Sequence, residues 1–236
     1  MREGSPIANL DTVVVTGASR GIGLELVRQF LQSGQSVVAA CRKPENAAEL
    51  RALACTRLSL LRLDVSEEAS VSEFVKELGA EPVDVLVNNA GVWGGAHQDL
   101  GQMDYAGWRE AFEVNTLGPY RVSTALVGHL SRSSNPRIVT LSSQMGALSR
   151  QSTGSYAYRS SKAAVNKVMQ VLALELRAKG IIVCPVHPGW VRTEMGGSEA
   201  DLSVEESAAG LLNLIDRLTL DHSGRFWTWE GAEHPW

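Results

Sequence analysis

Short apolar runs alternate along this chain with longer segments in which apolar residues recur every three or four positions. The short runs have the length and the Val, Ile and Leu content of buried strands, and the longer segments have helical periodicity. Strands and helices that alternate in this way form a parallel sheet with helices on both faces. We therefore expect one doubly wound α/β domain over residues 1–236, with a seven-stranded parallel sheet flanked by helices. The expected strands are TVVVT at 12–16, SVVAAC at 36–41, RLSLLRLD at 57–64, VDVLVN at 83–88, RIVTLS at 137–142, IIVCPVH at 181–187 and RFWTW at 225–229.

The ends of the helical segments carry residues that commonly stop or start a helix. Gly34, Gly79 and Gly180 each follow a periodic segment, where a left-handed glycine often ends a helix. Ser203 and Glu206 have the spacing of a capping box, so we expect the last helix to begin there.

Composition and charge narrow the class of protein. Hydrophobic residues make up 44% of the chain and charged residues 20%, which is typical of a globular protein. The formal net charge of −4 is unfavourable for sequence-independent nucleic-acid binding, which needs a dense Lys and Arg surface. The first residues, MREGSPIANLDTVVV, lack the apolar core of a signal peptide, and no stretch approaches the ~18 apolar residues of a membrane span. We expect a cytoplasmic protein that binds neither nucleic acid nor membranes.

Cysteine and histidine do not have the spacing of a disulfide framework or a metal site. Cys41, Cys55 and Cys184 are odd in number and far apart, so we expect reduced and buried thiols. The five histidines are scattered through the chain. We therefore expect no bound metal.

TGASRGIG at 16–23 is the first motif with a chemical meaning, and it lies between the first expected strand and the next helix. Gly17 permits a tight turn, Gly21 leaves room for a pyrophosphate, and Gly23 allows the helix to pack closely on the strand. The helix N-terminus then offers free N–H groups and the positive end of a dipole to phosphates. The motif predicts a dinucleotide-binding Rossmann domain.

The residues after the second strand indicate which dinucleotide binds. An NAD-binding domain usually has Asp or Glu there, about twenty residues after the glycine motif, to accept from the ribose 2′-hydroxyl. Here the strand ends in Cys41, Arg42 and Lys43, and Arg20 stands in the glycine loop. Cations suit a 2′-phosphate, and a guanidinium matches its geometry especially well. We therefore expect NADP(H) as the cofactor.

Tyr158 and Lys162 are the candidates for proton transfer. Their spacing puts both side chains on one face of a helix. A phenol titrates near ~10, and acid–base work near neutral pH asks for a value ~3 units lower, which corresponds to about 4 kcal/mol. One ammonium at ~4 Å supplies about that much at an effective dielectric constant of ~20. We therefore expect Lys162 to lower the pKa of Tyr158.

Together these motifs resemble those of the short-chain dehydrogenase/reductase family, over almost the whole chain. The further matches, in order, are Asp64-Val65, NNAG at 88–91, Asn115, the set Ser143, Tyr158 and Lys162, and PGWVRT at 188–193. The resemblance implies an NADP(H)-dependent oxidoreductase that transfers a hydride between nicotinamide and a carbonyl or alcohol substrate. It also implies a homodimer or homotetramer, with long helices near 104–130 and 156–179 paired across a two-fold axis.

The resemblance also implies a role for each matching residue. Tyr158 exchanges the substrate proton, Ser143 orients the carbonyl or hydroxyl, and Asn115 supports a water relay to Lys162. Asp64 contacts the adenine, Asn88 and Ala90 shape its ribose side, Gly91 closes the turn, Lys162 binds the nicotinamide ribose, and the 188–193 segment holds the carboxamide. The expected cofactor-binding residues are Gly17, Ser19, Arg20, Gly21, Ile22, Gly23, Arg42, Asp64, Val65, Asn88, Ala90, Gly91, Tyr158, Lys162, Pro188, Gly189, Val191 and Thr193.

Two alternatives concern the catalytic hydroxyls. The loop between Ser143 and Tyr158 is slightly longer than in many family members, so Ser142 is a second candidate serine. Gly146 stands at the family's offset from Ser143 and favours it. Tyr156 is a weaker proton donor, because the residue four positions later is a serine and not a lysine.

Two stretches of low regularity, 91–103 and 189–203, are expected to be loops at the strand ends, where ligands bind in such sheets. Trp93 and Trp190 lie on these loops. They either form an apolar wall of the substrate site or anchor the loops by packing.

Within the family, YAYRSSKAAVN and the ending SGRFWTWEGAEHPW are most similar to the sniffer and C-factor carbonyl-reductase-like branch. The C-factor resemblance leaves a second function open: a dinucleotide-binding signalling or regulatory protein with dispensable catalysis. An extended-type sugar-nucleotide epimerase normally needs a larger substrate domain than 236 residues provide.

Overall fold

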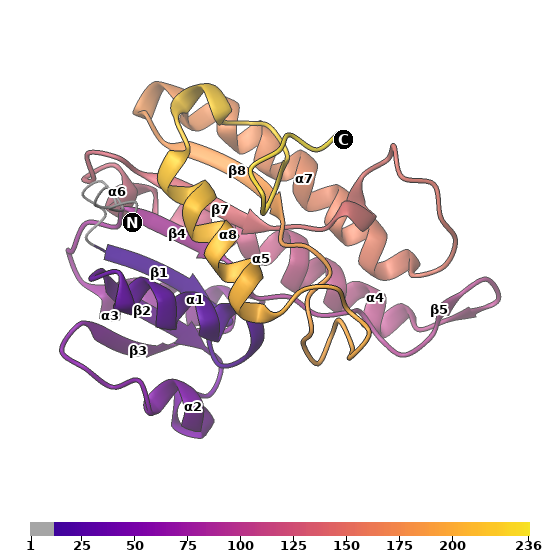
Figure 1. Cartoon of the computed structure of the whole chain (residues 1–236), viewed down its shortest axis with the longest axis horizontal. Coiled ribbons are helices and arrows are strands. Elements are labelled where there is room, and N and C mark those ends of the chain that lie inside the picture. Colours follow the sequence, from indigo (N-terminus) through magenta and orange to yellow (C-terminus); the bar gives the residue numbers. More distant parts are fainter. Residues whose placement is uncertain (1–11) are drawn as a thin grey trace, which may run out of the picture.

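The expected strands form one seven-stranded parallel sheet (Figure 1). The computed structural model describes residues 12–236, so the first eleven residues of the expected domain, and with them most of the stretch that argued against a signal peptide, lie outside the described residues. The strands of the sheet are β1 (Thr12–Thr16), β2 (Ser36–Cys41), β3 (Leu58–Arg62), β4 (Val85–Asn88), β7 (Arg137–Leu141), β8 (Ile182–His187) and β9 (Trp227–Thr228). Their order is β3-β2-β1-β4-β7-β8-β9. Strands β1 to β3 are therefore added toward one edge of the sheet and β4 to β9 toward the other, so the order of strands reverses between β1 and β4.

The central strands match the expected bounds best. β1 and β2 have the bounds predicted from sequence, because each is one continuous apolar run with buried side chains. The edge strand β3 is half-exposed and shorter than RLSLLRLD at 57–64. At the other edge, only Trp227–Thr228 of the expected RFWTW strand pairs with β8, because a turn follows in which Thr228 and Ala232 form a backbone hydrogen bond.

Helices cover both faces of the sheet (Figure 1). On one face α1 (Gly21–Gln32) and α8 (Val204–Arg217) pack on the sheet, and on the other α3 (Glu68–Leu78), α5 (Gly118–Ala125) and α7 (Tyr156–Leu176) do so. The remaining helices and turns are α2 (Ala48–Arg51), α4 (Tyr105–Phe112), α6 (Val127–Leu130), η1 (Pro44–Asn46), η2 (Glu113–Leu117), η3 (Gln144–Gly146), η4 (Arg177–Lys179) and η5 (Leu220–His222). Within residues 12–236, no helix combines the length and apolar character that a membrane span needs.

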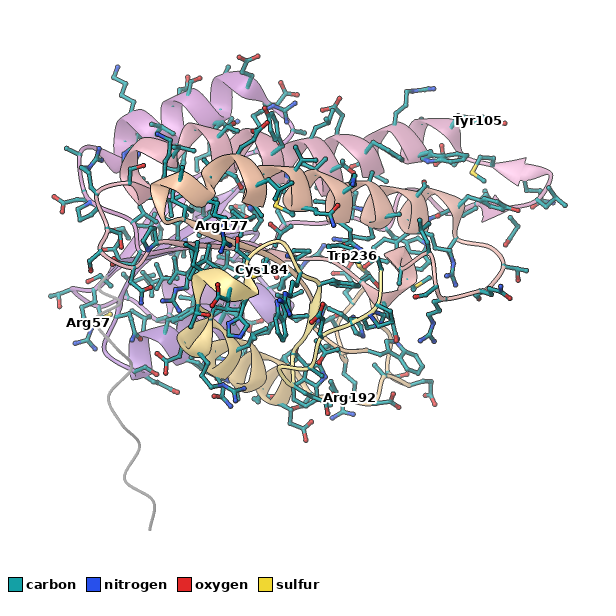
Figure 2. All side chains as sticks on the ribbon, turned by 90° about the horizontal axis from the view of Figure 1, so that it is seen from above. Arg57, Tyr105, Arg177, Cys184, Arg192 and Trp236 are labelled. Carbon is teal, nitrogen blue, oxygen red and sulfur yellow. The ribbon has the colours of Figure 1, made fainter. Side chains whose placement is uncertain are left out.

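Two segments differ from the sequence expectation. The long helix expected near 104–130 is continuous from α4 through η2 to α5, but η2 is a π-helical turn, and α6 follows as a short helix after a turn at Leu126. The stretch at 91–103 is not only a loop, because β5 (Gln98–Asp99) and β6 (Gln102–Met103) pair there as an antiparallel hairpin. The hairpin projects from the body of the protein beside α4 (Figure 1). Tyr105, which follows it, lies at the opposite end of the molecule from Arg57 (Figure 2).

The cap residues and two of the three cysteines behave as expected. Gly34, Gly79 and Gly180 have positive φ values of 95°, 74° and 70°, and Ser203 and Glu206 form the predicted capping box at the start of α8. Cys41 and Cys184 are buried, as expected. The expectation was wrong for Cys55, which is exposed because it lies in the turn before the edge strand β3.

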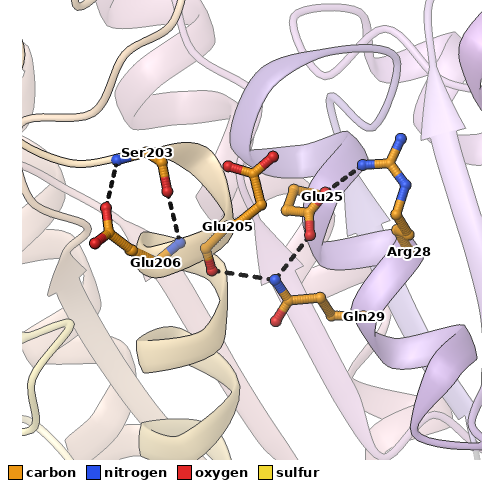
Figure 3. Close-up of polar contacts among 6 residues, drawn as sticks. All are labelled: Glu25, Arg28, Gln29, Ser203, Glu205 and Glu206. Carbon is orange, nitrogen blue, oxygen red and sulfur yellow. Dashed lines mark hydrogen bonds and ion pairs between the residues drawn. The ribbon is translucent and has the colours of Figure 1, made fainter.

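Polar side chains join α1 to α8 beside the capping box (Figure 3). The Glu25 carboxylate of α1 is buried, accepts from Nε2 of Gln29 at 2.8 Å and pairs with Arg28. Nε2 of Gln29 also donates to the carbonyl of Glu205 at 3.1 Å, in the first turn of α8. The Gln29 contact ties α1 to the first turn of α8.

The largest fully buried side chain among residues 12–236 is Arg137, at the start of β7. Its Nη1 donates to the carbonyl of Ile215 and, at 3.3 Å, to that of Asp216, in the last turn of α8. Burial lowers the pKa of its guanidinium, and Asp216 and Asp84 oppose that effect.

We expect Arg137→Met to lower the free energy of unfolding by about 3 kcal/mol, because it leaves buried carbonyls of α8 without their donor. Urea unfolding followed by circular dichroism measures this change. Arg62→Met is the matched control, since Arg62 is exposed on the edge strand β3. Equal losses in the two variants would contradict a special role for Arg137.

Candidate active site

A cavity of about 1550 Å³ lies at the carboxyl ends of the strands, where the sheet order reverses. Its walls come from the loops that follow β1, β2, β3, β4, β7 and β8, together with the start of α7. The expected site residues that line it are Gly17, Ser19, Arg20, Gly21, Ile22, Arg42, Asp64, Val65, Ala90, Gly91, Tyr158, Lys162, Pro188 and Thr193. The expected residues outside its lining are Gly23, Asn88, Asn115, Ser143, Gly189 and Val191.

The glycine-rich turn after β1 needs its glycines for two reasons. Gly17 and Gly21 have φ values of 63° and 55°, in the left-handed region. A Cβ on Gly17 would also lie 2.7 Å from Cα of Ala90, and one on Gly21 would lie 3.3 Å from Cγ2 of Thr193. A Cβ on Gly23 would lie 2.6 Å from the carbonyl oxygen of Gly17, so Gly23 keeps the turn closed on itself.

Two residues that the sequence argument did not single out hold this turn. Nδ2 of Asn89 donates to the carbonyls of Thr16 and Gly17 at 2.9 and 3.0 Å. Oγ1 of Thr16 accepts from the backbone N–H groups of Asn89 and Ala90, both at 3.1 Å. The turn after β1 is therefore tied to the turn after β4. The NNAG motif predicted the turn after β4. The hydrogen-bond partners of its Asn89 could not be predicted, because they lie more than seventy residues away in the sequence.

Asn88 does not reach the cavity. Its Nδ2 donates to Oγ of Ser123 at 3.0 Å and to Oγ1 of Thr140 at 3.2 Å, between α5 and β7. Successive side chains of a strand point to opposite faces, and here Asn89 is the one that lines the cavity. A contribution of Asn88 to ribose binding would have to act through the packing of β4.

The rim of the cavity beyond β2 is basic. Arg42 and Lys43 are exposed there and line the cavity, as does Arg62. Arg20 was expected to join this group, but its guanidinium forms an ion pair with Glu194, which follows Thr193 on the opposite wall. Arg20 thus links the glycine loop to the segment after β8, and the positive charge nearest the end of β2 comes from Arg42 and Lys43.

Asp64 and Val65 line the cavity after β3, as expected. Oδ1 of Asp64 accepts from the backbone N–H of Ser66 at 3.0 Å and from its hydroxyl at 2.6 Å. The backbone N–H of Asp64 donates to Oγ of Ser70 at 2.9 Å. These bonds fix the carboxylate at the cavity wall.

Tyr158 and Lys162 lie one turn apart near the start of α7, and both line the cavity. Nζ of Lys162 lies 5.7 Å from the centroid of the Tyr158 ring and donates to the carbonyl of Leu141 at 2.8 Å. The side chain of Ser143 forms a hydrogen bond with Tyr158. The fold therefore brings a phenol, a hydroxyl and an ammonium from two separate elements to one place.

The pKa of Tyr158 is raised in the structure, whereas the sequence predicted that Lys162 would lower it. Burial raises the pKa of Tyr158 to about 12, and the hydrogen bond with Ser143 opposes that shift without overcoming it. Burial also lowers the pKa of Lys162 to about 8. Both shifts disfavour the charged form, and loss of hydration is the largest cause of each. The phenol therefore keeps its proton at neutral pH.

Ser142 and Ser143 have different surroundings. The hydroxyl of Ser142 is buried and donates to Oδ1 of Asn166 at 2.5 Å, so it serves the packing of α7 although the residue lines the cavity. The hydroxyl of Ser143 accepts from the backbone N–H of Met145 at 3.1 Å and is the one that contacts Tyr158. Gly146 allows this loop to lie against α7, since a Cβ there would be 2.6 Å from the carbonyl carbon of Lys162.

Asn115 lies in the π-helical turn η2 and is buried. Its Oδ1 accepts from the backbone N–H of Val92, and its Nδ2 donates to the carbonyl of Val92, both at 2.8 Å. Nδ2 also donates to Oγ of Ser161 at 3.0 Å. In this structure the carboxamide holds the segment after β4 next to α7. Its role in a water relay stays a prediction.

The two loop tryptophans differ in position. Trp93 lines the cavity, and its ring stacks on Tyr158 with the centroids 4.7 Å apart. Trp190 does not line the cavity, and its Nε1 donates to the carbonyl of Gly196 at 2.9 Å. Of the two interpretations left open by the sequence, the structure therefore gives wall formation to Trp93 and loop packing to Trp190.

His187 ends β8 directly before Pro188 and is buried. Burial, followed by the nearby positive charges of His234 and Arg150, lowers its pKa to about 4. Between the usual value of about 6.5 and pH 4, the unfolded chain therefore binds a proton that the folded chain does not.

We expect this difference to remove about 3 kcal/mol of folding stability as the pH falls from 6.5 to 4. In His187→Gln the loss over that range is expected to be smaller by this amount. Urea unfolding at several pH values measures it, with the exposed His97→Gln as the matched control. Parallel pH curves for His187→Gln and the unmodified protein would contradict the assignment to His187.

Comparison with known proteins agrees with this geometry. The family model described as short chain dehydrogenase matches residues 11–202. The chain is 43% identical to the protein named C-signal of Myxococcus xanthus over 164 residues, which is 69% of this chain and 98% of that protein. The crystal structure of NADPH-bound carbonyl reductase from chicken fatty liver superposes with a TM-score of 0.91 at 31% identity, covering 96% of this chain and 99% of that one. The carbonyl reductase Sniffer of D. melanogaster does so with a TM-score of 0.91 at 27% identity and the same coverage.

Proposed function

The chain belongs to the short-chain dehydrogenase/reductase family, in the branch of the sniffer and C-signal proteins, and on this basis we propose that it is an NADP(H)-dependent carbonyl reductase. One observation carries the proposal: Tyr158 and Lys162 line one part of a cavity, Ser143 forms a hydrogen bond with Tyr158, and the cavity rim beyond β2 carries Arg42 and Lys43. The substrates are carbonyl compounds in the reductive direction and the matching alcohols in the oxidative one.

The cavity fits a phosphorylated dinucleotide. The turn at Gly17 and Gly21 keeps its backbone free of side chains next to the N-terminus of α1, which is where a pyrophosphate binds. Arg42 and Lys43 offer two exposed cations to a ribose 2′-phosphate. Asp64 and Val65 would hold the adenine, Lys162 the nicotinamide ribose, and the 188–193 segment the carboxamide. NADP(H) supplies the hydride when bound.

The chain's own residues handle the proton. Tyr158 holds its phenol proton at neutral pH, because burial raises its pKa to about 12, and so it acts as the donor to the reduced carbonyl oxygen. Ser143 donates a hydrogen bond to the same oxygen and stabilises the negative charge that develops there. Lys162, fixed by the carbonyl of Leu141, keeps a positive charge beside the phenol while the proton leaves. Asn115 holds the Val92 segment and is proposed to support proton resupply to Lys162.

The absorbance of reduced nicotinamide tests this proposal on a panel of aldehydes, ketones and quinones. We expect NADPH oxidation with some of these compounds and little with NADH. Tight NADPH binding without turnover of any compound would favour the signalling function that the likeness to C-signal leaves open. A failure to bind NADPH would overturn the proposal itself.

We further propose that residues 1–236 act as one domain, in the cytoplasm, as a homodimer or homotetramer. Exposed apolar side chains on α4, α5 and α7 support the assembly, among them Tyr105, Tyr120 and Leu174. Sedimentation velocity measures the oligomeric state, and a monomer at working concentration would contradict the proposed homodimer or homotetramer.

A further inference from the structure

The segment that carries Trp93 is held at several points. Val92 is bonded on both sides to the Asn115 carboxamide. Gly94 follows, with a φ of 94°, and a Cβ there would lie 2.8 Å from Cβ of Ala111 and 3.1 Å from Cβ of Ala157. The backbone after Trp93 therefore lies pressed between α4 and α7, so the indole has a defined position.

One buried side chain joins this segment to Tyr158. Nε2 of Gln98, in β5, donates to the carbonyl of Trp93 at 2.9 Å, and its Oε1 accepts from the backbone N–H of Tyr158 at 3.0 Å. The N-cap residue of α7, Ser155, has a left-handed φ of 55° and makes no capping bond with its side chain. Gln98 thus satisfies a free N–H at the start of α7 and fixes both aromatic residues relative to each other.

The result is an aromatic surface at the reacting centre. The Trp93 and Tyr158 rings stack with centroids 4.7 Å apart and planes 25° from parallel. The Trp93 side chain is 39% exposed and lines the cavity, as do Val92 and Met195. A substrate carbonyl within reach of the phenol oxygen must therefore lie beside the indole.

We propose that Trp93 is a specificity-determining residue that selects carbonyl compounds whose C=O is attached to a flat aromatic ring. This inference rests on the proposed function and names its substrate class. A flat ring can stack on the indole, whereas a puckered saturated ring of the same size cannot make that contact over its whole face. Aromatic stacking contributes beyond simple burial, enough for a preference of about 5-fold. Trp93 acts on substrate choice, while Gln98 is a positioning residue.

Two ketones that differ only in ring saturation test the proposal. Acetophenone and cyclohexyl methyl ketone have the same carbon skeleton, and kcat/KM is measured for both with NADPH. We expect the unmodified protein to favour acetophenone by about 5-fold. Trp93→Leu is expected to bring the ratio near unity, and Trp93→Phe to keep most of the preference. Trp108→Leu is the matched control, because Trp108 lies on α4 outside the cavity lining.

Ligand binding separates this inference from the proposed function. Saturation-transfer NMR with the same two ketones gives relative affinities whether or not turnover occurs. Preferential acetophenone binding that is lost in Trp93→Leu supports the role of Trp93 even if no ketone is reduced, in which case the reductase proposal alone fails. An unchanged binding and kcat/KM ratio in Trp93→Leu would overturn the inference and leave the reductase proposal standing.

Discussion

Tyr158→Phe is expected to lower kcat/KM for ketone reduction by about 10³-fold, because it removes the proton donor and leaves the rest of the site in place. The phenol lies at the cavity wall with Ser143 hydrogen-bonded to it and the Lys162 ammonium 5.7 Å from its ring centroid. Phenylalanine keeps the ring and its stacking on Trp93, so the packing of α7 is retained. Initial rates of NADPH oxidation at saturating cofactor measure the loss.

Tyr156→Phe is the matched control for this substitution. Tyr156 lies on the same helix, is 43% exposed and packs near Trp108, away from the cavity lining. We expect its activity to stay within about 2-fold of the unmodified protein, since surface changes away from a site have small effects. NADPH affinity should be retained in both variants. Substantial residual activity in Tyr158→Phe would assign proton donation to another group.

Arg42→Glu is expected to lower the ratio of kcat/KM for NADPH over NADH by about 10²-fold or more. The substitution removes charge-assisted hydrogen bonds to the 2′-phosphate, each of which contributes about 1.5–3 kcal/mol. It also places a carboxylate where an NAD-binding domain has its acceptor for the ribose 2′-hydroxyl. Arg42 and Lys43 line the cavity beyond β2, whereas Arg20 pairs with Glu194. Steady-state kinetics with both cofactors measure the ratio.

Arg132→Glu makes the same change of charge at an exposed position outside the cavity lining. It separates a local effect at the 2′-phosphate from a change in the net charge of the protein. We expect its cofactor ratio to equal that of the unmodified protein. If Arg42→Glu also left the ratio unchanged, the basic rim would not select the cofactor.

The sequence determined the fold and most of the cavity. Continuous apolar runs such as 12–16 and 36–41 must be buried on both sides, so the parallel sheet and its helix layers followed from local pattern alone. The motif at 16–23 and the spacing of Tyr158 and Lys162 are also local, and they predicted a turn and a helix face that the structure contains.

Contacts between residues far apart in the sequence could not be predicted from local pattern. The π-helical turn at Glu113–Leu117 lies where the Asn115 carboxamide bonds the backbone of Val92, and Gln98 accepts from the backbone N–H of Tyr158 sixty residues away. The ion pair of Arg20 with Glu194 joins two cavity-lining residues that are 174 positions apart in the sequence.

The protonation state of Tyr158 also depends on the folded chain. The helical spacing correctly put Lys162 beside the phenol, but the pKa depends on how completely the surrounding elements exclude water. The Trp93 ring stacks on the phenol, and burial raises the pKa of Tyr158 although the hydrogen bond with Ser143 opposes the shift. Sequence spacing fixes which groups of one helix share a face, whereas desolvation and long-range contacts depend on atoms that only the folded chain brings together.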